Sequence, residues 1–425
     1  MKLPDPAPQN ADVRMKGFAS RTTVEAAISW IDSTLPKLCN LATERVGLLE
    51  ATGRVLSADV ISDVNVPGFA RSMMDGFALR AEETYGATTY NSLPFQIVGT
   101  CLPGSSFPAE VTKGQTVRIM TGAPLPSGTD AVLPVENTET LGQTLLAMGE
   151  VSAGKHVGVV GEDVHCGRTV LVAGRILRPQ DIGVLSSIGF SEASVVRKPS
   201  VRILITGNEL LPSGTLPCGY QIADANGPML FSLVSRDGGL PNMPSIIPDD
   251  RESLLAALSE PADIVLVSGG SSVGQDDYAP ILLAEQGTLA IHGIAMRPSS
   301  PTGMGILNDR FVFLLPGNPV SCLCAYDFFA GRAIRSMSGG NKDWPYRRIQ
   351  ATLTRKLVST IGRVDYARVK LHGNARVKLH DSTVEPVAIS GASVLTSTTE
   401  ADGFVIIPAD SEGYAAESIV DVLLY

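Results

Sequence analysis

The chain has 425 residues, of which 44% are hydrophobic and 18% are charged, so it can build several cores and is not generally disordered. Its net charge is −9 and it contains no dense run of Lys and Arg, which excludes a duplex-binding protein with a basic stripe. An acidic protein that handles anions must therefore gather its few positive charges at one place.

Targeting and metal-binding signals are weak in this sequence. The six cysteines are scattered and form no CxxC pair, which argues against a zinc site and against a disulfide framework. Residues 1–20 contain no apolar core of signal-peptide length, and no stretch reaches the roughly 18 apolar residues of a membrane helix. We therefore expect a cytoplasmic protein that binds neither membranes nor nucleic acid.

The N-terminal half changes texture along the chain. Residues 1–18 are rich in proline and polar side chains and predict a flexible tail. Apolar residues recur at helical spacing from Val24 to Leu35, and the run LLEATGRVLSADV at 48–60 predicts a second helix. In residues 63–165, short apolar runs alternate with Gly/Pro turns, which predicts an all-β segment. A short strand, TVLVAG, and a helix that begins near Pro179 follow.

The C-terminal half begins with an alternation of strand and helix candidates over residues 199–338. The apolar runs VRILIT, PSIIP, DIVLVSGG and FVFLLPG predict an open parallel sheet with helices on both faces. Ligands in such sheets bind beyond the carboxyl ends of the strands, so the loops after VRILIT, DIVLVS and FVFLL should meet at one crevice. Residues 345–425 return to short strands and predict a small β-barrel or sandwich.

The expected fold is therefore an α/β multidomain chain with a central, parallel-type α/β domain, an N-terminal α-plus-β region that contains an inserted β domain, and a small C-terminal β-barrel. The expected divisions are a tail at 1–18, a helical linker domain I at 19–62 and 166–196, a β-rich domain II at 63–165, an α/β domain III at 197–340 and a β-barrel domain IV at 341–425.

Two glycine-containing loops are the first candidates for a binding site. In SGGSSVGQDD, from Ser268 to Asp277, glycines allow close backbone approach, and successive N–H groups before a helix suit a phosphate. A tight β-to-α turn without a ligand is an equally good interpretation of this loop. In LLPGNPVS, Asn318 and Pro319 have the pattern of a helix start, and the loop is either a capping device or a second wall of the same crevice.

Acidic residues in loops are the second group of candidates. Loop carboxylates bind hard cations such as Mg²⁺, usually with substrate phosphates completing the shell, although each acid taken singly is more often a turn or cap residue. The stretch IMTGAPLPSGTDAVLPVEN at 119–137 is interpreted as a turn-rich loop between strands, with no chemistry assigned. The candidate acids are Asp75, Asp163, Glu209, Asp224 and Asp277.

Taken together, ten segments in one order resemble the MoeA family, the molybdopterin molybdenumtransferases, which includes the E domains of gephyrin and of its plant counterpart. The resemblance covers about residues 22–425. The matching segments are ATGRVLSADV, VPGFARSMMDGFALR, IMTGAPLPSGTDAV, GEDV, TGNEL, DANG, SGGSSVGQDD, LPGNPVS, GRVDYARV and SGASVLTSTTEADGFVIIP.

The resemblance implies four domains per subunit, an elongated homodimer and an active site between subunits. It implies Mg²⁺-dependent cleavage of molybdopterin-AMP coupled to molybdate insertion, with release of AMP and the molybdenum cofactor. The α/β domain resembles the molybdopterin-binding fold of the adenylyltransferase of the same pathway. That adenylyltransferase and cofactor-accepting enzymes are the protein partners that the resemblance suggests.

The resemblance also assigns roles to residues. The family's functional acids fall on the five acids named above, with Asp224 and Asp277 as the expected Mg²⁺ ligands. The molybdate pocket maps to Pro298, Arg368 and Ser397, joined by Arg297 and Ser300 of the RPSSP loop. The loop residues expected to contact molybdopterin and its phosphate are Ser268, Gly269, Gly270, Ser271, Ser272, Gly274, Pro316, Gly317, Asn318 and Pro319.

The RPSSP loop departs from the family pattern KPGKP. Arg297 keeps the charge of the first lysine but not its geometry, and Ser300 loses the charge of the second. Two hypotheses follow. The first is the enzyme, which is favoured because all five acids are retained. The second is a carrier or scaffold paralogue that binds molybdopterin but inserts metal inefficiently. The sequence leaves molybdate and tungstate undistinguished.

Overall fold

The computed structural model describes residues 20–39, 42–270, 277–372, 382–388 and 391–425. The chain divides into two compact units. The larger unit comprises Met1–Glu44, Gly53–Val55 and Val196–Tyr425, and the smaller unit comprises Arg45–Thr52 and Leu56–Val195. No helix among the described residues is long and apolar enough to cross a membrane.

A mixed sheet forms the centre of the larger unit. Its order is β16-β13-β18-β22-β21-β19, with β17 also paired to β13. The expected parallel α/β arrangement is confirmed for its first strands, and an antiparallel edge is added that the sequence did not indicate. The parallel strands are β13 (Ser200–Thr206), β16 (Leu240–Pro241), β17 (Ser245–Ile247), β18 (Ile264–Ser268) and β22 (Arg310–Leu315), and the antiparallel edge is β21 (Gly303–Leu307) and β19 (Thr288–His292).

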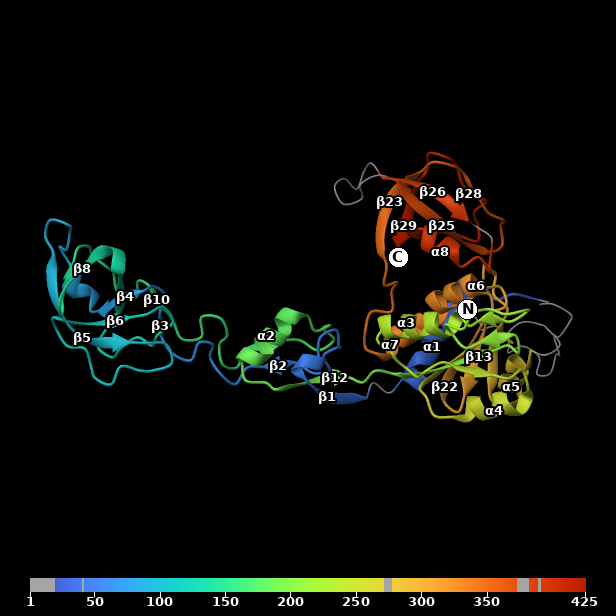
Figure 1. Ribbon diagram of the computed structural model, residues 1–425, viewed down its shortest axis with the longest axis horizontal. Helices are drawn as coiled ribbons and strands as arrows, with labels where there is room; N and C mark the ends of the chain where they lie inside the picture. Colours follow the sequence, from blue (N-terminus) through green and yellow to red (C-terminus); the bar gives the residue numbers. More distant parts are fainter. Residues whose placement is uncertain (1–19, 40–41, 271–276, 373–381, 389–390) are drawn as a thin grey trace. The chain divides into compact units, whose positions relative to one another are not determined.

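Both faces of this sheet are covered by helices (Figure 1). Alternate strand residues point to opposite faces, so Ile203, for example, belongs to one core and Leu204 to the other. The first core contains residues of α1 (Val24–Leu38), α3 (Asn226–Arg236), α6 (Pro319–Ala325) and α7 (Gly331–Met337). The second core contains residues of α4 (Arg251–Ser259) and α5 (Tyr278–Gln286). Burial on both faces explains why the strands are continuous apolar runs.

The helix predicted at 48–60 is wrong. Leu48–Glu50 forms a single 3-10 turn, η1, and Gly53 adopts a left-handed φ of 79° that ends any helical path. Leu56 then forms an isolated bridge with Val195. Ala51, Leu56 and Val60 are nevertheless buried in a core of the smaller unit, whereas Leu49 is 97% exposed, so the segment buries most of its apolar residues without forming a helix.

The C-terminal strands close into a barrel, as expected. β25 (Val364–His372) pairs with both β26 (Thr383–Ala388) and β27 (Gly403–Ile407), and β23 (Arg347–Leu353) and β29 (Ile419–Leu424) complete the ring. A short strand from the α/β domain, β20 (Met296–Arg297), adds to the barrel by pairing in parallel with β25. The register places Arg297 opposite Asp365, so the RPSSP loop is anchored to the barrel wall.

A buried acidic residue also links the α/β domain to the barrel within the larger unit. Asp327 lies in the π-helical turn η4 (Tyr326–Ala330) and accepts hydrogen bonds from Arg236 at 3.0 Å and from the Tyr346 hydroxyl at 2.8 Å. Burial raises the pKa of Asp327 to about 6, although the guanidinium of Arg236 opposes that shift. Because Tyr346 immediately precedes β23, this network fixes the path by which the chain enters the barrel.

The smaller unit contains a six-stranded sheet with the order β7-β4-β6-β5-β9-β8, which confirms the β-rich segment. A second small core lies around α2 (Pro179–Ser187), where Pro179 is the first helical residue as predicted. The sheet strands are β4 (Gly76–Leu79), β5 (Leu93–Cys101), β6 (Gln115–Ile119), β7 (Ala131–Pro134), β8 (Thr138–Leu141) and β9 (Thr144–Ala147). Around α2 lie β1 (Thr43–Gly47), β2 (Val60–Ile61), β11 (Thr169–Leu171) and β12 (Glu192–Val196).

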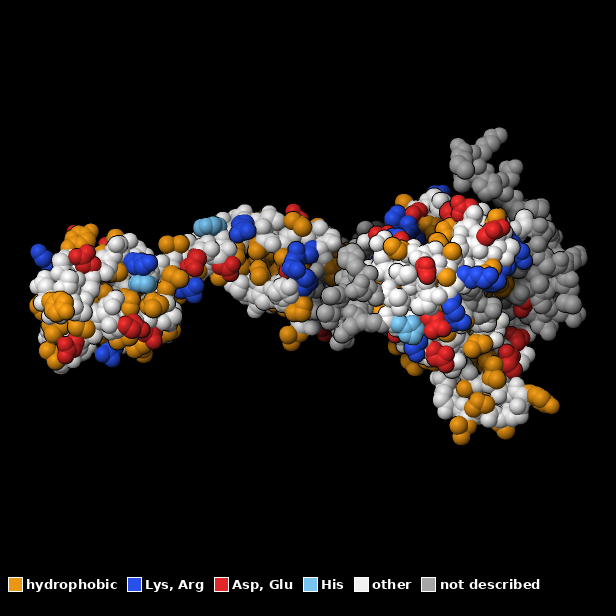
Figure 2. Space-filling model, turned by 90° about the horizontal axis from the view of Figure 1, so that it is seen from above, with side chains coloured by type: hydrophobic (Ala, Val, Ile, Leu, Met, Phe, Trp, Pro, Cys, Tyr) orange, Lys and Arg blue, Asp and Glu red, His pale blue; other side chains and the backbone are white. Residues whose placement is uncertain are grey.

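Short elements complete the described chain. The paired ribbons are β3 (Arg71–Ser72) with β10 (Val157–Gly158), β14 (Leu210–Leu211) with β15 (Ile222–Ala223), and β24 (Leu357–Val358) with β28 (Gly413–Tyr414). The short helices are η2 (Ala81–Thr84), η3 (Val135–Asn137) and α8 (Thr396–Glu400). On the face drawn in Figure 2, basic and acidic side chains are interspersed among the described residues.

Candidate functional site

A crevice lies where the parallel strands β13, β18 and β22 end. Ile205 pairs with Ser268 and Ser268 pairs with Leu315, so the three strands terminate side by side. The Gly269 N–H continues this ladder by donating to the Leu315 carbonyl at 3.1 Å. The loops that follow, TGNEL, SGG and PGN, therefore start at one edge of the sheet, as expected for a parallel α/β domain.

Asn226, at the start of α3, braces this crevice. Its Nδ2 donates to Ser268 Oγ at 2.9 Å and to the Gly317 carbonyl at 2.7 Å. A carbonyl can only accept, so these contacts fix the orientation of the amide. Asn226 Oδ1 is buried and has no hydrogen-bond donor within the described part of the chain, and the same holds for Thr206 Oγ1 at the end of β13. Two polar atoms beside the loops are thus left for further hydrogen bonds.

The glycines of the SGG loop are required by close packing against β13. Gly269 has a φ of +97°, and a Cβ there would lie 2.4 Å from the Thr206 carbonyl oxygen. A Cβ on Gly317 would lie 3.5 Å from the Gly269 Cα, so the SGG and PGN loops are neighbours. The turn interpretation of these glycines is therefore supported. The candidates Ser271, Ser272 and Gly274 fall outside the described residues.

Three of the five candidate acids belong to this crevice. Asp224 is buried and accepts the Gly227 N–H at 2.9 Å, which ties its carboxylate to the first turn of α3. Glu209 folds back on its own loop, where its Oε2 lies 2.9 Å from the position of a Cβ on Gly207. Asp277 immediately precedes α5, and its Oδ1 lies 3.9 Å from the position of a Cβ on Gly270. The three acids thus border the loops at the strand ends.

The other two acids, Asp75 and Asp163, lie on exposed loops of the smaller unit. Asp75 Oδ1 accepts hydrogen bonds from the Thr121 N–H and from the Thr121 hydroxyl, each at 2.7 Å. These bonds hold the pKa of Asp75 below its usual value. Asp163 is held through its backbone, since its N–H donates to the Val66 carbonyl at 3.0 Å.

Thr121 is a partner of a candidate site residue, Asp75, that the sequence did not reveal. It belongs to the IMTGAP turn, to which no chemistry was assigned, and it is 46 positions away from its partner. This hydrogen bond forms only because two turns that are distant in the sequence lie side by side in the fold. The nearest available signal was the closeness of a threonine to a glycine in a turn, which is common in loops and carries little specificity.

We expect Thr121→Val to raise the pKa of Asp75 part of the way back to its ordinary value. The variant loses the hydroxyl donor and keeps the backbone donor, so the ionised carboxylate is stabilised less. A pH titration followed by carboxyl ¹³C NMR measures this change. Thr129→Val is the matched control, because the Thr129 hydroxyl donates to the Pro126 carbonyl and not to Asp75. An unchanged Asp75 titration in Thr121→Val would contradict the assigned role.

A cavity of about 740 Å³ adjoins the PGNP loop in the larger unit. Asn318 lines it, and although Asn318 occupies the N-cap position of α6, its side chain makes no capping hydrogen bond. Pro319 is the first residue of that helix, as expected. The site candidates that line the cavity are Arg297, Pro298, Ser300, Pro316 and Asn318. Further lining residues include Arg21, Ser299, Ser321, Thr360 and Arg363.

Two other molybdate candidates are not among the lining residues. Arg368 is 0% exposed in β25 of the barrel, and Ser397 is buried in α8, where its hydroxyl donates to the Val394 carbonyl. Ser300 does line the cavity, and its Oγ is buried without a hydrogen-bond partner in the described part of the chain. The expected pocket residues thus fall into a cavity-lining group and a buried group, Arg368 and Ser397, that does not line the cavity.

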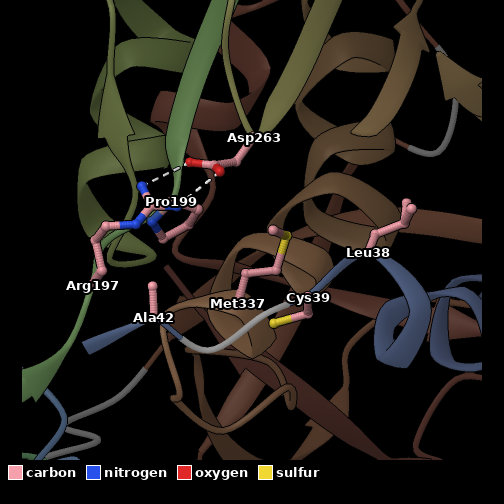
Figure 3. A pocket seen from close by; sticks show the side chains of 7 residues that line it. All are labelled: Leu38, Cys39, Ala42, Arg197, Pro199, Asp263 and Met337. Atoms are coloured by element: carbon pink, nitrogen blue, oxygen red, sulfur yellow. Dashed lines mark hydrogen bonds and ion pairs between the residues drawn. The ribbon is translucent and has the colours of Figure 1, made fainter. Parts of the chain in front are cut away.

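A smaller cavity of about 230 Å³ lies at the opposite, amino-terminal edge of the sheet (Figure 3). Its charged residues, Arg197 and Asp263, are paired with each other at 2.8 Å and 3.0 Å. Asp263 also accepts from the N–H and the hydroxyl of Ser200, at 2.6 Å and 2.7 Å. These groups satisfy one another and support the start of β13, so we assign this cavity a structural role.

Comparisons with known proteins agree with this geometry. The MoeA N-terminal region (domains I and II) matches residues 22–189, a probable molybdopterin binding domain matches 202–336, and the MoeA C-terminal region (domain IV) matches 350–425. A molybdopterin molybdenumtransferase of Staphylococcus aureus strain COL is 30% identical over 383 residues, covering 89% of this chain and 90% of the relative. A putative molybdopterin biosynthesis protein of Methanocaldococcus jannaschii is 31% identical, covering 91% of this chain and 93% of that protein.

A solved structure extends the agreement to the fold. The crystal structure of the molybdopterin biosynthesis moeA protein of Pyrococcus horikoshii has a TM-score of 0.81 and 30% sequence identity, and it covers 95% of this chain and 99% of that chain. Family models, relatives and fold therefore lead to one conclusion. The chain belongs to the MoeA family, and it is an enzyme of molybdenum cofactor biosynthesis of the molybdopterin molybdenumtransferase kind.

Proposed function

We propose that this enzyme inserts molybdate into adenylylated molybdopterin in a Mg²⁺-dependent reaction that releases AMP. The observation that carries the proposal is that one loop, PGNP, contributes to both the acid-bordered crevice and the arginine-lined cavity. Gly317 accepts from Asn226 in the crevice, and Asn318 lines the cavity. The reaction has two anionic reactants, which are an organic substrate that bears a phosphate and an incoming oxyanion. These two reactants need two such adjacent sites. Both sites must replace the water that the anions lose.

The chain's residues have distinct roles in this proposal. The SGG and PGN loops bind the pterin and its phosphate, and Asn226 Oδ1 accepts a hydrogen bond from a donor group of the ligand. Among the described residues, no cluster of three or more His, Cys, Asp or Glu forms a closed metal cage. Proteins commonly hold Mg²⁺ through one or two carboxylates together with substrate phosphates. Asp224 and Asp277 would hold the ion, which when bound neutralises charge on the phosphate oxygens.

Asp75 and Asp163 take part through a second subunit in this proposal. They lie in the smaller unit, whereas Glu209, Asp224 and Asp277 lie in the larger one. We propose a cytoplasmic homodimer in which acids of both units serve one reaction, built from subunits with the four domains described above. Its other partners would be the molybdopterin adenylyltransferase and the enzymes that accept the cofactor.

We expect the protein at micromolar concentration to elute with the mass of a dimer in size-exclusion chromatography with light scattering. Mixing inactive Asp75→Asn with inactive Asp277→Asn subunits should restore activity, because a mixed dimer contains one site with both wild-type acids. A monomeric mass with full activity would contradict this arrangement. A dimer without restored activity would show that each site draws its acids from one subunit.

The reaction itself is tested by incubating purified protein with molybdopterin-AMP, Mg²⁺ and molybdate. AMP release and cofactor formation are followed together, and both should require Mg²⁺. The alternative, a carrier or scaffold paralogue, is favoured by one observation, the loss of a positive charge at Ser300. That alternative predicts molybdopterin binding without turnover, so the same incubation separates the two functions.

A further inference from the structure

The cavity beside the PGNP loop concentrates positive charge in a chain whose net charge is −9. Its lining includes Arg21, Arg297 and Arg363, and no Asp or Glu of the described part of the chain lines it. The carboxylate that pairs with two of these guanidiniums is Asp365, which is 0% exposed and belongs to β25. Three positive charges and one buried negative charge leave the cavity with an excess of positive charge, which attracts anions.

The guanidinium of Arg297 is paired with a buried carboxylate of the barrel. Its Nε donates to Asp365 Oδ1 at 3.1 Å, and one of its terminal nitrogens donates to Asp365 Oδ2. The β20–β25 pairing sets these two residues opposite each other. A two-point pair of this kind with a buried carboxylate fixes the guanidinium and uses the donors on one edge of its fork. Removing Arg297 would leave Asp365 buried with less compensation.

Arg363 is placed differently. Its Nε is 3.3 Å from Asp365 Oδ1, an ion pair that falls short of a hydrogen bond, and its NH2 group has a long contact of 3.4 Å to Thr360 Oγ1. Asp365 Oδ2 is already occupied by the Ser359 hydroxyl at 2.8 Å and by Arg297. The side chain of Arg363 is 35% exposed and lines the cavity. Most of its five N–H donors thus remain available to a ligand.

We propose that Arg363 is the residue that binds a doubly charged tetrahedral oxyanion in this cavity, with Arg21 adding charge and Asp365 acting as a positioning residue. The inference rests on the proposed function and deepens it. In this inference, Arg363 supplies the positive charge that Ser300 lacks, and Arg297 has a structural role. Free molybdate and a phosphate group of the organic substrate share this chemistry, and both can bind a planar fork of N–H donors.

The test is isothermal titration of the full-length protein with sodium molybdate and, separately, with inorganic phosphate, in the absence of any pterin. Arg363→Ala should weaken oxyanion binding roughly tenfold to a hundredfold, because a hydrogen-bonded charge is lost. Arg363→Lys should recover part of the affinity, since it restores the charge and not the fork. Arg355→Ala is the matched control, because Arg355 is an exposed barrel arginine that pairs with Glu385 and does not line the cavity.

A further variant separates binding from folding. Arg297→Ala should lower the thermal midpoint more than Arg363→Ala does, and should weaken molybdate binding less. If Arg363→Ala weakens the binding of molybdate and not of phosphate, the ligand is the free metal oxyanion. If it weakens the binding of phosphate and not of molybdate, the ligand is a substrate phosphate. The proposal is overturned if Arg363→Ala binds both anions like wild type, if Arg355→Ala loses as much affinity, or if wild type binds neither. Because no pterin is present, failure of the proposed reaction leaves this titration interpretable.

Discussion

Asp277→Asn should reduce the rate of AMP release from molybdopterin-AMP by roughly a hundredfold or more, since a lost metal ligand removes several kcal/mol of transition-state stabilisation and about 1.4 kcal/mol is a factor of ten. The affinity for molybdopterin should change by less than about threefold. The reason is that a carboxylate acting on charge at the phosphate has its largest effect in the transition state, whereas the SGG and PGN loops bind the ground state. Single-turnover AMP release and equilibrium fluorescence binding measure the two quantities.

The control for Asp277→Asn is Asp309→Asn. Asp309 lies in the exposed turn between β21 and β22 with a φ of 56°, a conformation that asparagine adopts as readily as aspartate. This variant makes the same chemical change at the opposite end of β22 from the PGN loop and should leave both measurements unchanged. If Asp277→Asn lowered binding and turnover by the same factor, Asp277 would be a residue that shapes the ground-state site.

The regular part of the larger unit followed from local pattern. Runs such as VRILIT are apolar at every position because both faces of β13 are covered, and the rule that ligands bind at carboxyl strand ends correctly brought three separate loops to one crevice. The same local reasoning failed at 48–60, where apolar spacing suggested a helix but Gly53 turned the chain. A hydrophobic pattern reports which residues are buried more reliably than which element buries them.

Residues of the candidate site escaped prediction where their role depends on distant pairing. Arg297 and Arg363 line one cavity because β20 adds to β25, which brings Arg297 against Asp365, a carboxylate 68 positions away in the sequence. Thr121 meets Asp75 across 46 positions for a similar reason. Spacing within a motif carries no information about such contacts, so the sequence could identify the charged groups and not the partners that set their roles.

Gly227→Ala should lower AMP release roughly tenfold to a hundredfold, because a misplacement of about 1 Å at a reacting group can cost that much. A Cβ at this position would lie 2.2 Å from Asp224 Oδ2 and 2.9 Å from Pro244 Cβ, so the Asp224 carboxylate must move. The fold should survive, because Gly227 lies in the first turn of α3 and alanine is the better helix former by roughly 0.5–1 kcal/mol.

The matched control is Gly183→Ala in α2, where a new Cβ meets nothing within 4 Å. It should stabilise the protein slightly without changing activity. The decisive measurement is the double variant: if Gly227→Ala acts by displacing Asp224, it should add little to the loss already caused by Asp224→Ala. Additive losses would mean that Gly227→Ala disturbs the crevice through Pro244 and the start of α3, and that the position of the Asp224 carboxylate is not what limits AMP release.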